Sequence, residues 1–262
     1  MNTNKRMPVL FVGHGSPMNA IGENRARVAW QEEGRRLGKP SAIIAVSAHW
    51  MTNGLFVRQA PDNPQINDMY GFPDELYAVS YEPKSSPEYA EKVLALLEGQ
   101  AEVRNDWGMD HGAWSVLCNM YPEADVPVVM LSTDVMASPR SFYDVGKKLR
   151  PLRDEGAMIL ASGNIVHNLR MVNWHMTDGY DWADSFDETI HDAIMAGKFE
   201  IPVNFKAIEG YRRAIPTVEH YYPLLIALGA TDAEDNIRVW NDYRELGSMS
   251  MTSYTFENRL SD

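Results

Sequence analysis

Three histidines of the sequence, His14, His49 and His167, each stand just after a short apolar run. Runs of this kind, rich in Val, Ile and Ala, are typical of strands buried on both faces of a sheet. Ligands of open α/β sheets bind beyond the carboxyl ends of the strands, so the three side chains can converge. Because neutral imidazole is the commonest protein metal ligand, the spacing predicts a histidine-rich metal site. The glycines on both sides of His14 leave room for backbone to pass close to it.

Two further histidines stand next to carboxylates. Glu219 and His220 come just before Pro223, which suits the first turn of a helix. Either member of that pair could be a metal ligand, although a Glu at a helix entry is also favoured by the helix macrodipole. Asp110 and His111 lie among Trp and Gly residues ahead of another helix, a context that favours a tight aromatic pocket. A histidine in such a pocket can act as a general acid or base.

The other candidates carry no evident chemistry. We expect His175 in a loop, His191 on a solvated helix face, and Cys118 packed on a helix without a basic partner that would activate it. The sequence contains no Gly-x-Ser-x-Gly, Walker A, Gly-x-Gly-x-x-Gly or His-Glu-x-x-His motif. A mononuclear, histidine-rich site without thiolates remains, and imidazole ligands suit Zn, Fe, Ni or Cu.

Composition narrows the class of protein. The chain has 262 residues, a formal net charge of −12, 45% hydrophobic residues and one cysteine. So acidic a chain is a poor binder of nucleic acid or of an anionic membrane surface, and one cysteine cannot form an intrachain disulfide. The apolar stretch near the N-terminus is too short for a secretory signal, and no run approaches the ~20 apolar residues of a membrane span. These features predict a cytoplasmic protein with no nucleic acid or membrane partner.

Strand and helix patterns alternate along most of the chain. Strands are predicted over 8–12, 42–46, 126–132 and 157–161, with helices over 25–37, 86–97, 138–153, 182–196 and 224–228. Alternation of this kind predicts an α/β fold with a mostly parallel central sheet flanked by helices and a metal site at the strand C-terminal ends. Two late strands, 237–243 and 248–256, suggest antiparallel additions and hence a mixed sheet. No linker divides residues 1–262, so a single domain is predicted, with a long, aromatic loop over 61–83.

Five segments together resemble a known family. They are GHGSP at 13–17, SAHW at 47–50, WGMDHG at 107–112, ASGNIVHNL at 161–169 and EHYYPLL at 219–225. In this order they resemble the class III extradiol ring-cleavage dioxygenases, most nearly the 4,5-DOPA dioxygenase branch. The resemblance implies an oxidoreductase that opens a catechol, DOPA-like ring beside its hydroxyls and incorporates both atoms of O2 at a mononuclear non-haem metal. Fe(II) is then expected for activity, and Zn(II) is plausible as the bound metal.

The resemblance also implies roles for individual residues. His14 and His49 would be metal ligands, His220 would be the third, and His167 would be a fourth ligand or a base. His111 would act as an acid–base group that also positions oxygen. Glu219 competes with His220 and His167 for the remaining ligand position. We expect the substrate to contact Ser16, Asp110, Tyr70 and Trp174.

Two other functions fit the same residues. A zinc-dependent hydrolase on a similar α/β scaffold would use metal-bound water as the nucleophile and His111 as the acid. A metal-binding or regulatory protein would hold the metal without turnover. The partners expected for the dioxygenase are a small catechol and O2, and the chain would be a monomer or a small homo-oligomer.

Overall fold

A mixed sheet of eight strands, in the order β4-β3-β5-β2-β6-β1-β10-β7, runs through the computed structural model. The structure describes residues 6–258; residues 1–5 and 259–262, which the predicted single domain includes, lie outside it. The strands are β1 Val9–Gly13, β2 Ala42–Thr52, β3 Leu55–Val57, β4 Ala101–Val103, β5 Val128–Asp134, β6 Ala157–Gly163, β7 Asp235–Trp240 and β10 Ser253–Asn258. A separate two-stranded ribbon joins β8 Arg244–Glu245 to β9 Met249–Ser250.

The centre of the sheet is parallel and its flanks are mixed. Strands β5, β2, β6 and β1 run in the same direction, and Ser162 of β6 lies level with Ser47 of β2 on one side and Val12 of β1 on the other. Strand β10 is antiparallel to both β1 and β7, and β3 is antiparallel to β5. The four central strands are the apolar runs of the sequence, and they are almost wholly buried, as expected for strands covered on both faces.

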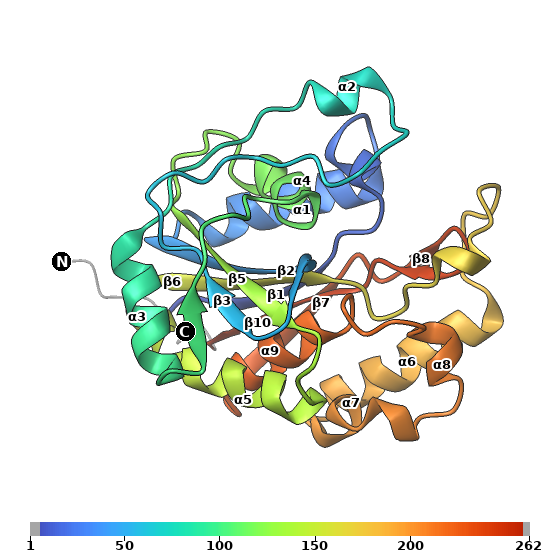
Figure 1. The fold of residues 1–262 in the computed structure, drawn as a ribbon. Coiled ribbons are helices and arrows are strands. Elements are labelled where there is room, and N and C mark those ends of the chain that lie inside the picture. The colour runs from blue at the N-terminus through green and yellow to red at the C-terminus, as the bar shows by residue number, and fades with distance from the viewer. Residues whose placement is uncertain (1–5, 259–262) are drawn as a thin grey trace.

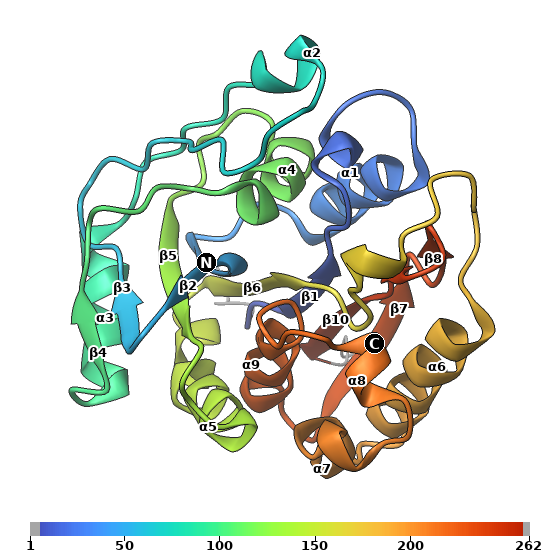
Figure 2. The same cartoon turned by 45° about the vertical axis from the view of Figure 1, so that its right-hand side comes forward.

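Helices cover both faces of this sheet (Figure 1). They are α1 Arg25–Leu37, α2 Asp74–Tyr77, α3 Pro87–Leu97, α4 His111–Met120, α5 Pro139–Leu149, α6 Asp181–Met195, α7 Glu200–Val203, α8 Tyr211–Ala214 and α9 Tyr222–Ala230. Side chains of α1 and α4 pack in one core, and those of α3, α5, α6 and α9 pack in the other. Figure 2 shows the two layers from a second side. None of the helices within residues 6–258 combines the length and apolar character that a membrane crossing requires.

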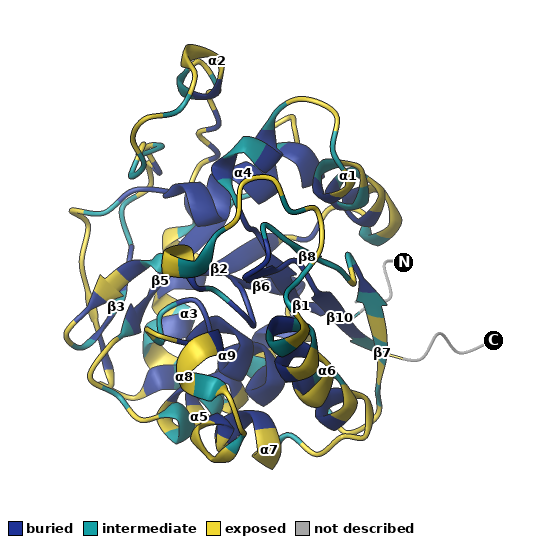
Figure 3. Cartoon of the chain, turned by 90° about the vertical axis from the view of Figure 1, so that its right-hand side faces the viewer, coloured by how far each residue is buried: buried dark blue, intermediate teal, exposed yellow. Residues whose placement is uncertain are grey.

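The predicted α/β class and mixed sheet are confirmed, and several boundaries agree closely. Helix α1 matches the predicted range; Asn24 caps its start by accepting from the Arg27 amide, and Gly38 ends it with φ of 74°. The three-residue strands β3 and β4 escaped prediction. The late strands β7 and β10 pair with each other as expected, although the residues between them in the sequence form the β8–β9 ribbon. Residues 61–83 form the predicted long loop, which carries only α2 and projects from the body (Figure 3).

Candidate metal centre

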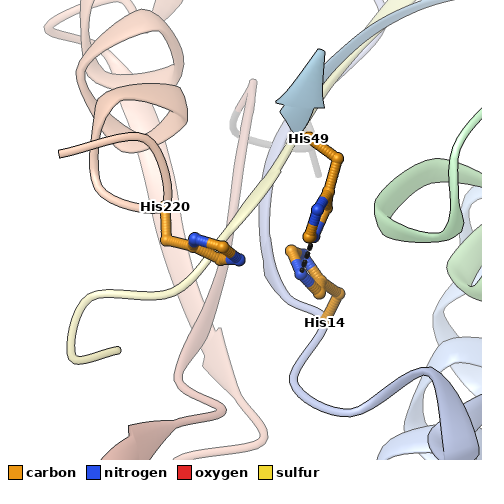
Figure 4. A group of neighbouring side chains, drawn as sticks. All are labelled: His14, His49 and His220. Atoms are coloured by element: carbon orange, nitrogen blue, oxygen red, sulfur yellow. Dashed lines mark hydrogen bonds between the residues drawn. The ribbon is translucent and has the colours of Figure 1, made fainter. Parts of the chain in front are cut away.

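Side chains of His14, His49 and His220 converge from three separate elements (Figure 4). His14 follows the end of β1, and His220 lies two residues before α9. His49 lies in the outer part of β2, where the pairing with β6 has ended and the register with β5 is broken by a bulge. One ring nitrogen from each histidine lies within 4.8 Å of the other two, and the Nε2 atoms of His14 and His49 are 3.2 Å apart.

The His14 ring is held from behind by Ser162. Its Nδ1 is 2.9 Å from the Ser162 hydroxyl, and that hydroxyl donates its own proton to the carbonyl oxygen of Gly112. A hydroxyl has a single proton to donate, so it must accept one from His14 Nδ1. This assigns the Nδ1–H tautomer and leaves Nε2 with a free lone pair toward the centre.

The other two rings are backed in the same way by carboxylates. His220 Nδ1 lies 3.2 Å from Glu219 Oε1, which also accepts from the Thr217 hydroxyl at 2.8 Å. His49 Nδ1 lies 3.4 Å from Asp68 Oδ2. A hydrogen bond at Nδ1 fixes the tautomer and orientation of a ligating imidazole, and Ser162 and Glu219 provide one for His14 and His220. The Asp68 carboxylate lies beside Nδ1 of His49 at ion-pair distance. All three histidines therefore present Nε2 as the nitrogen that is free to bind a cation.

Burial keeps these imidazoles neutral. Loss of hydration, reinforced by neighbouring histidines, lowers the pKa of His14 and of His220 well below the ordinary 6.5. The pKa of His49 falls to about 3 for the same reasons, against the opposing pull of Asp68. Metals bind the neutral imidazole, so the donor set suits a divalent ion such as Zn²⁺ or Fe²⁺ near neutral pH.

Two glycines allow the rings to come this close. A Cβ on Gly112 would lie 2.6 Å from Ser47 Oγ and 2.9 Å from His49 Cδ2. A Cβ on Gly163 would lie 2.1 Å from the carbonyl oxygen of His220. That oxygen accepts a hydrogen bond at 2.8 Å from the backbone amide of Asn164, the residue after Gly163. Neither glycine position has room for a larger residue unless a histidine moves.

The glycines beside His14 leave room for another segment of the chain, as expected. A Cβ on Gly13 would lie 2.6 Å from the carbonyl carbon of Met251, and one on Gly15, where φ is 59°, would lie 2.4 Å from the Met251 Sδ. The segment before β10 passes close to both glycines: its backbone lies against Gly13, and the Met251 side chain lies against Gly15.

His111 and His167 complete a group of five histidines. His111 is the first residue of α4, and its ring centroid is 3.9 Å from that of His49. His167 follows β6 and stacks on His220, with centroids 3.5 Å apart and planes 9° from parallel. Burial, followed by the charge of His111, lowers the pKa of His167 to about 4. His167 lies within ligand distance of Glu219 and His220 but outside the group formed with His14 and His49.

A pocket of about 410 Å³ opens onto these histidines. Its lining consists of the five histidines together with Gly15, Ser16, Pro17, Met69, Tyr70, Phe72, Leu169, Val172, Trp174, Leu246 and Met249. Three of the four predicted substrate contacts, Ser16, Tyr70 and Trp174, are therefore part of its wall. The hydroxyl of Ser16 also accepts from the Met18 amide, which caps the short helix Pro17–Ala20.

Asp110 lies behind the site and does not line the pocket. Its carboxylate is fully buried and accepts from the Ser47 hydroxyl at 2.5 Å and from Trp107 Nε1 at 3.1 Å. Burial, with the nearby charge of Asp68, raises its pKa to about 6. The geometry therefore does not support a direct contact between Asp110 and the substrate. The hydrogen bonds of Asp110 instead connect β2 with the segment at the start of α4.

The sequence reasoning missed two residues that orient the site, Asp68 and Ser162. Asp68 stands in the long loop two residues before Tyr70, and only its place among aromatic anchors could have drawn attention to it. Of the two histidines set aside, His175 is exposed, whereas His191 is only partly so and its Nδ1 lies 3.2 Å from the Tyr254 hydroxyl.

Comparison with known proteins gives consistent matches along most of the chain. Residues 11–257 match the family model LigB, described as the catalytic LigB subunit of aromatic ring-opening dioxygenase. The chain is 44% identical over 254 residues to the 4,5-DOPA dioxygenase extradiol of Escherichia coli K12, covering 95% of this chain and 94% of that protein. It is 36% identical over 255 residues to the 4,5-DOPA dioxygenase extradiol of Beta vulgaris, covering 94% and 95%.

The similarity extends to solved structures, in fold as well as in sequence. The crystal structure of an uncharacterized protein from Escherichia coli K12 superposes with a TM-score of 0.84 at 40% sequence identity, covering 95% of this chain and 99% of that one.

Proposed function

We propose a specific reaction for this chain, which belongs to the LigB family of aromatic ring-opening dioxygenases. As a member of that family it is an extradiol ring-cleaving dioxygenase. The substrate we propose is a catechol of the DOPA type, the compound named for the bacterial and plant relatives. We further propose that both atoms of O2 enter the product.

The proposed metal ligands are His14, His49 and His220, with Fe(II) as the active metal. The observation that carries this assignment is their shared geometry, in which each Nδ1 is backed by an oxygen and each Nε2 faces the centre. Fe(II) held by these three histidines would supply the redox chemistry that activates O2. Because Glu219 is engaged by Thr217 and by His220, we assign it to orienting His220 and not to ligation.

We propose that His167 accepts a proton from the catechol. It lines the pocket, stacks on His220 and, with a pKa of about 4, is neutral near pH 7. A neutral imidazole facing the ligand can take a hydroxyl proton, which favours the catecholate. We therefore assign His167 to acid–base chemistry in preference to a fourth ligand position.

His111 is the second proposed acid–base group. Its Nδ1 lies 3.0 Å from Asp68 Oδ2, and its backbone amide donates to Asp68 Oδ1 at 2.8 Å. A carboxylate only accepts, so Nδ1 of His111 carries a proton, and in the neutral ring Nε2 would be the acceptor. We propose that His111 holds and moves a proton at Nε2 as the ring opens.

The remaining wall of the pocket keeps water away from the reacting ring. Met69, Phe72 and Leu246 are among the apolar side chains around the histidines. Exclusion of water strengthens the electrostatic contacts inside a site and suppresses side reactions.

Labelling with ¹⁸O2 tests the reaction. Protein loaded with Fe(II) and given DOPA should yield a ring-opened product in which both new oxygen atoms carry the label. The zinc hydrolase alternative would place oxygen from water in its product and would need no O2. A ring-opened product that carries no ¹⁸O from the labelled O2 would refute the dioxygenase assignment.

A further inference from the structure

The segment that carries His167 is hydrogen-bonded on both sides. Toward the β8–β9 ribbon, the amide of Ser250 donates to the carbonyl oxygen of Val166 at 2.9 Å. The amide of Asn168 donates to the carbonyl oxygen of Ser248 at 3.1 Å. On the opposite side, the amide of His167 itself donates to a carbonyl oxygen of α8 at 3.0 Å. The position of His167 at the pocket therefore depends on the position of the ribbon.

A single carboxylate of α6, Asp187, bonds to the ribbon at several points. Its Oδ1 accepts from the Ser250 hydroxyl at 2.6 Å. Its Oδ2 accepts from the Thr252 hydroxyl at 2.7 Å and from an Arg244 guanidinium nitrogen at 2.9 Å. Arg244 belongs to β8 and Ser250 to β9, while Thr252 immediately precedes β10. One side chain thus connects α6 with both strands of the ribbon and with the chain that leaves it.

The burial of Asp187 sets it apart from the other carboxylates around Arg244. Asp187 is 1% exposed, and burial raises its pKa against the opposing effect of its three donors. Asp184 and Asp242 also accept from Arg244, but their side chains are 36% and 58% exposed. A buried ion pair adds little net stability, yet removing one partner leaves the other charge uncompensated. Fixing one arrangement of packed elements is the better use of such a pair.

We propose that Asp187 is a positioning residue for the ring-opening reaction. By bonding to both strands of the ribbon, it holds the segment of His167 in place and keeps Leu246 and Met249 in the pocket wall. Asp187 does not line the pocket, so it acts through the ribbon and not by contact with the substrate. The inference rests on the proposed function, because it takes His167 to be an acid–base group.

Alanine variants test this role in the Fe(II)-loaded protein. Asp187→Ala removes all three bonds, and we expect kcat to fall by roughly 10- to 100-fold, because small displacements of a reacting group are costly. KM and the iron bound per chain should change much less. Ser250→Ala removes one of the bonds without changing any charge and should lower kcat in the same direction. It decides the question on its own if Asp187→Ala does not fold.

Asp242→Ala is the matched control. It makes the same change of charge and removes a contact to the same arginine, but at an exposed position. We expect it to keep the kcat of the unmodified chain.

Hydrogen exchange of the Zn(II)-loaded protein gives a readout that does not depend on turnover. The amides of Asn168 and Ser250 should exchange about tenfold faster in Asp187→Ala and Ser250→Ala, because their partners lie across the loosened contact. The amides of the central strands β2 and β5 should keep their rates.

Three results would overturn the inference. The first is a kcat in Asp187→Ala and Ser250→Ala equal to that of Asp242→Ala. The second is a fall in kcat without faster exchange at Asn168 and Ser250. The third is faster exchange throughout the sheet with loss of bound metal, which marks general destabilisation. Locally faster exchange in a protein that cleaves no catechol would support the positioning of the His167 segment and refute the proposed reaction.

Discussion

The carboxylate of Asp68 binds His111 twice, through the backbone amide at 2.8 Å and through Nδ1 at 3.0 Å. The same Oδ2 lies 3.4 Å from Nδ1 of His49. One side chain from the long loop thus orients both a proposed metal ligand and a proposed acid–base group. Burial raises the pKa of Asp68, but the hydrogen bond from His111 outweighs it and holds the pKa of this carboxyl below its usual value, so it is ionised near neutral pH.

Replacing Asp68 by Asn should impair turnover far more than substrate binding. The amide cannot supply a carboxylate to both histidines, so the tautomer and orientation of His111 are lost. We expect kcat to fall by roughly 10- to 100-fold, the range typical of residues that orient metal ligands, with KM changed much less. Glu75→Gln is the matched control because it removes one negative charge from an exposed position of the same loop. Equal kinetics for the two variants would show that Asp68 has no special role.

Replacing Glu219 by Gln distinguishes orientation from ligation. If Glu219 only orients His220, the variant should bind metal about 10- to 100-fold more weakly but retain one bound ion per chain. Metal content after dialysis against graded chelator measures this, with the exposed Glu209→Gln as control. Complete loss of metal in Glu219→Gln, combined with retention in His220→Ala, would make Glu219 the ligand instead.

Replacing Gly112 by Ala should weaken the metal site although alanine favours helices. The new Cβ would meet Ser47 Oγ at 2.6 Å and His49 Cδ2 at 2.9 Å, so His49 must shift. We expect at least a tenfold loss of metal affinity, consistent with the sensitivity of active sites to ångström displacements. Gly22→Ala serves as a control for general destabilisation, because its φ of 68° is strained for alanine but nothing lies within 4 Å. Normal metal binding by Gly112→Ala would contradict the packing described.

The metal-free protein should lose stability as the pH falls below about 6.5. The folded pKa values of His49 and His167, about 3 and about 4, lie below the ordinary 6.5, so in this range the unfolded chain binds protons that the folded chain does not. Each such histidine removes up to about 1.4 kcal/mol of unfolding free energy per pH unit. Asp110 has the opposite sign, because its raised value of about 6 stabilises the folded state as the pH falls toward 3.8.

Urea unfolding of the chelator-treated protein between about pH 7.5 and pH 5 checks this slope. His167→Gln should flatten it and Asp110→Asn should steepen it. Stability that is constant or rises over this range in the unmodified chain would contradict the burial of neutral histidines.

The sequence was sufficient for the framework because the framework depends on local patterns. Continuous apolar runs mark the buried parallel strands, and caps such as Asn24 and Gly38 mark the bounds of α1. The convergence of His14 and His49 follows from the topological rule that the C-terminal ends of parallel strands share one edge. Short strands such as β3 were not predicted, because three residues carry too little pattern.

What could not be predicted depends on contacts between distant segments. Asp68 reaches the site because its loop folds over the start of α4. No local pattern in the loop sequence predicts that path. Asp110 was predicted to face the substrate, but its partners Ser47 and Trp107 draw it into the interior. Gly13 and Gly15 were expected to leave room for passing backbone, but the sequence could not show that the segment is the one at Met251, far along the chain.

Oxygen uptake by the reconstituted protein tests the central claim most directly. The metal-free chain and its His14→Ala variant are each loaded with Fe(II) or with Zn(II), given a catechol, and followed with an oxygen electrode and by the spectrum of the product. We expect stoichiometric O2 consumption and ring opening only for the unmodified chain with Fe(II), while His14→Ala stays folded but inactive. Ring cleavage retained by His14→Ala, or no uptake by the Fe(II) protein across a range of catechols, would contradict the assignment of this histidine cluster as the dioxygenase centre.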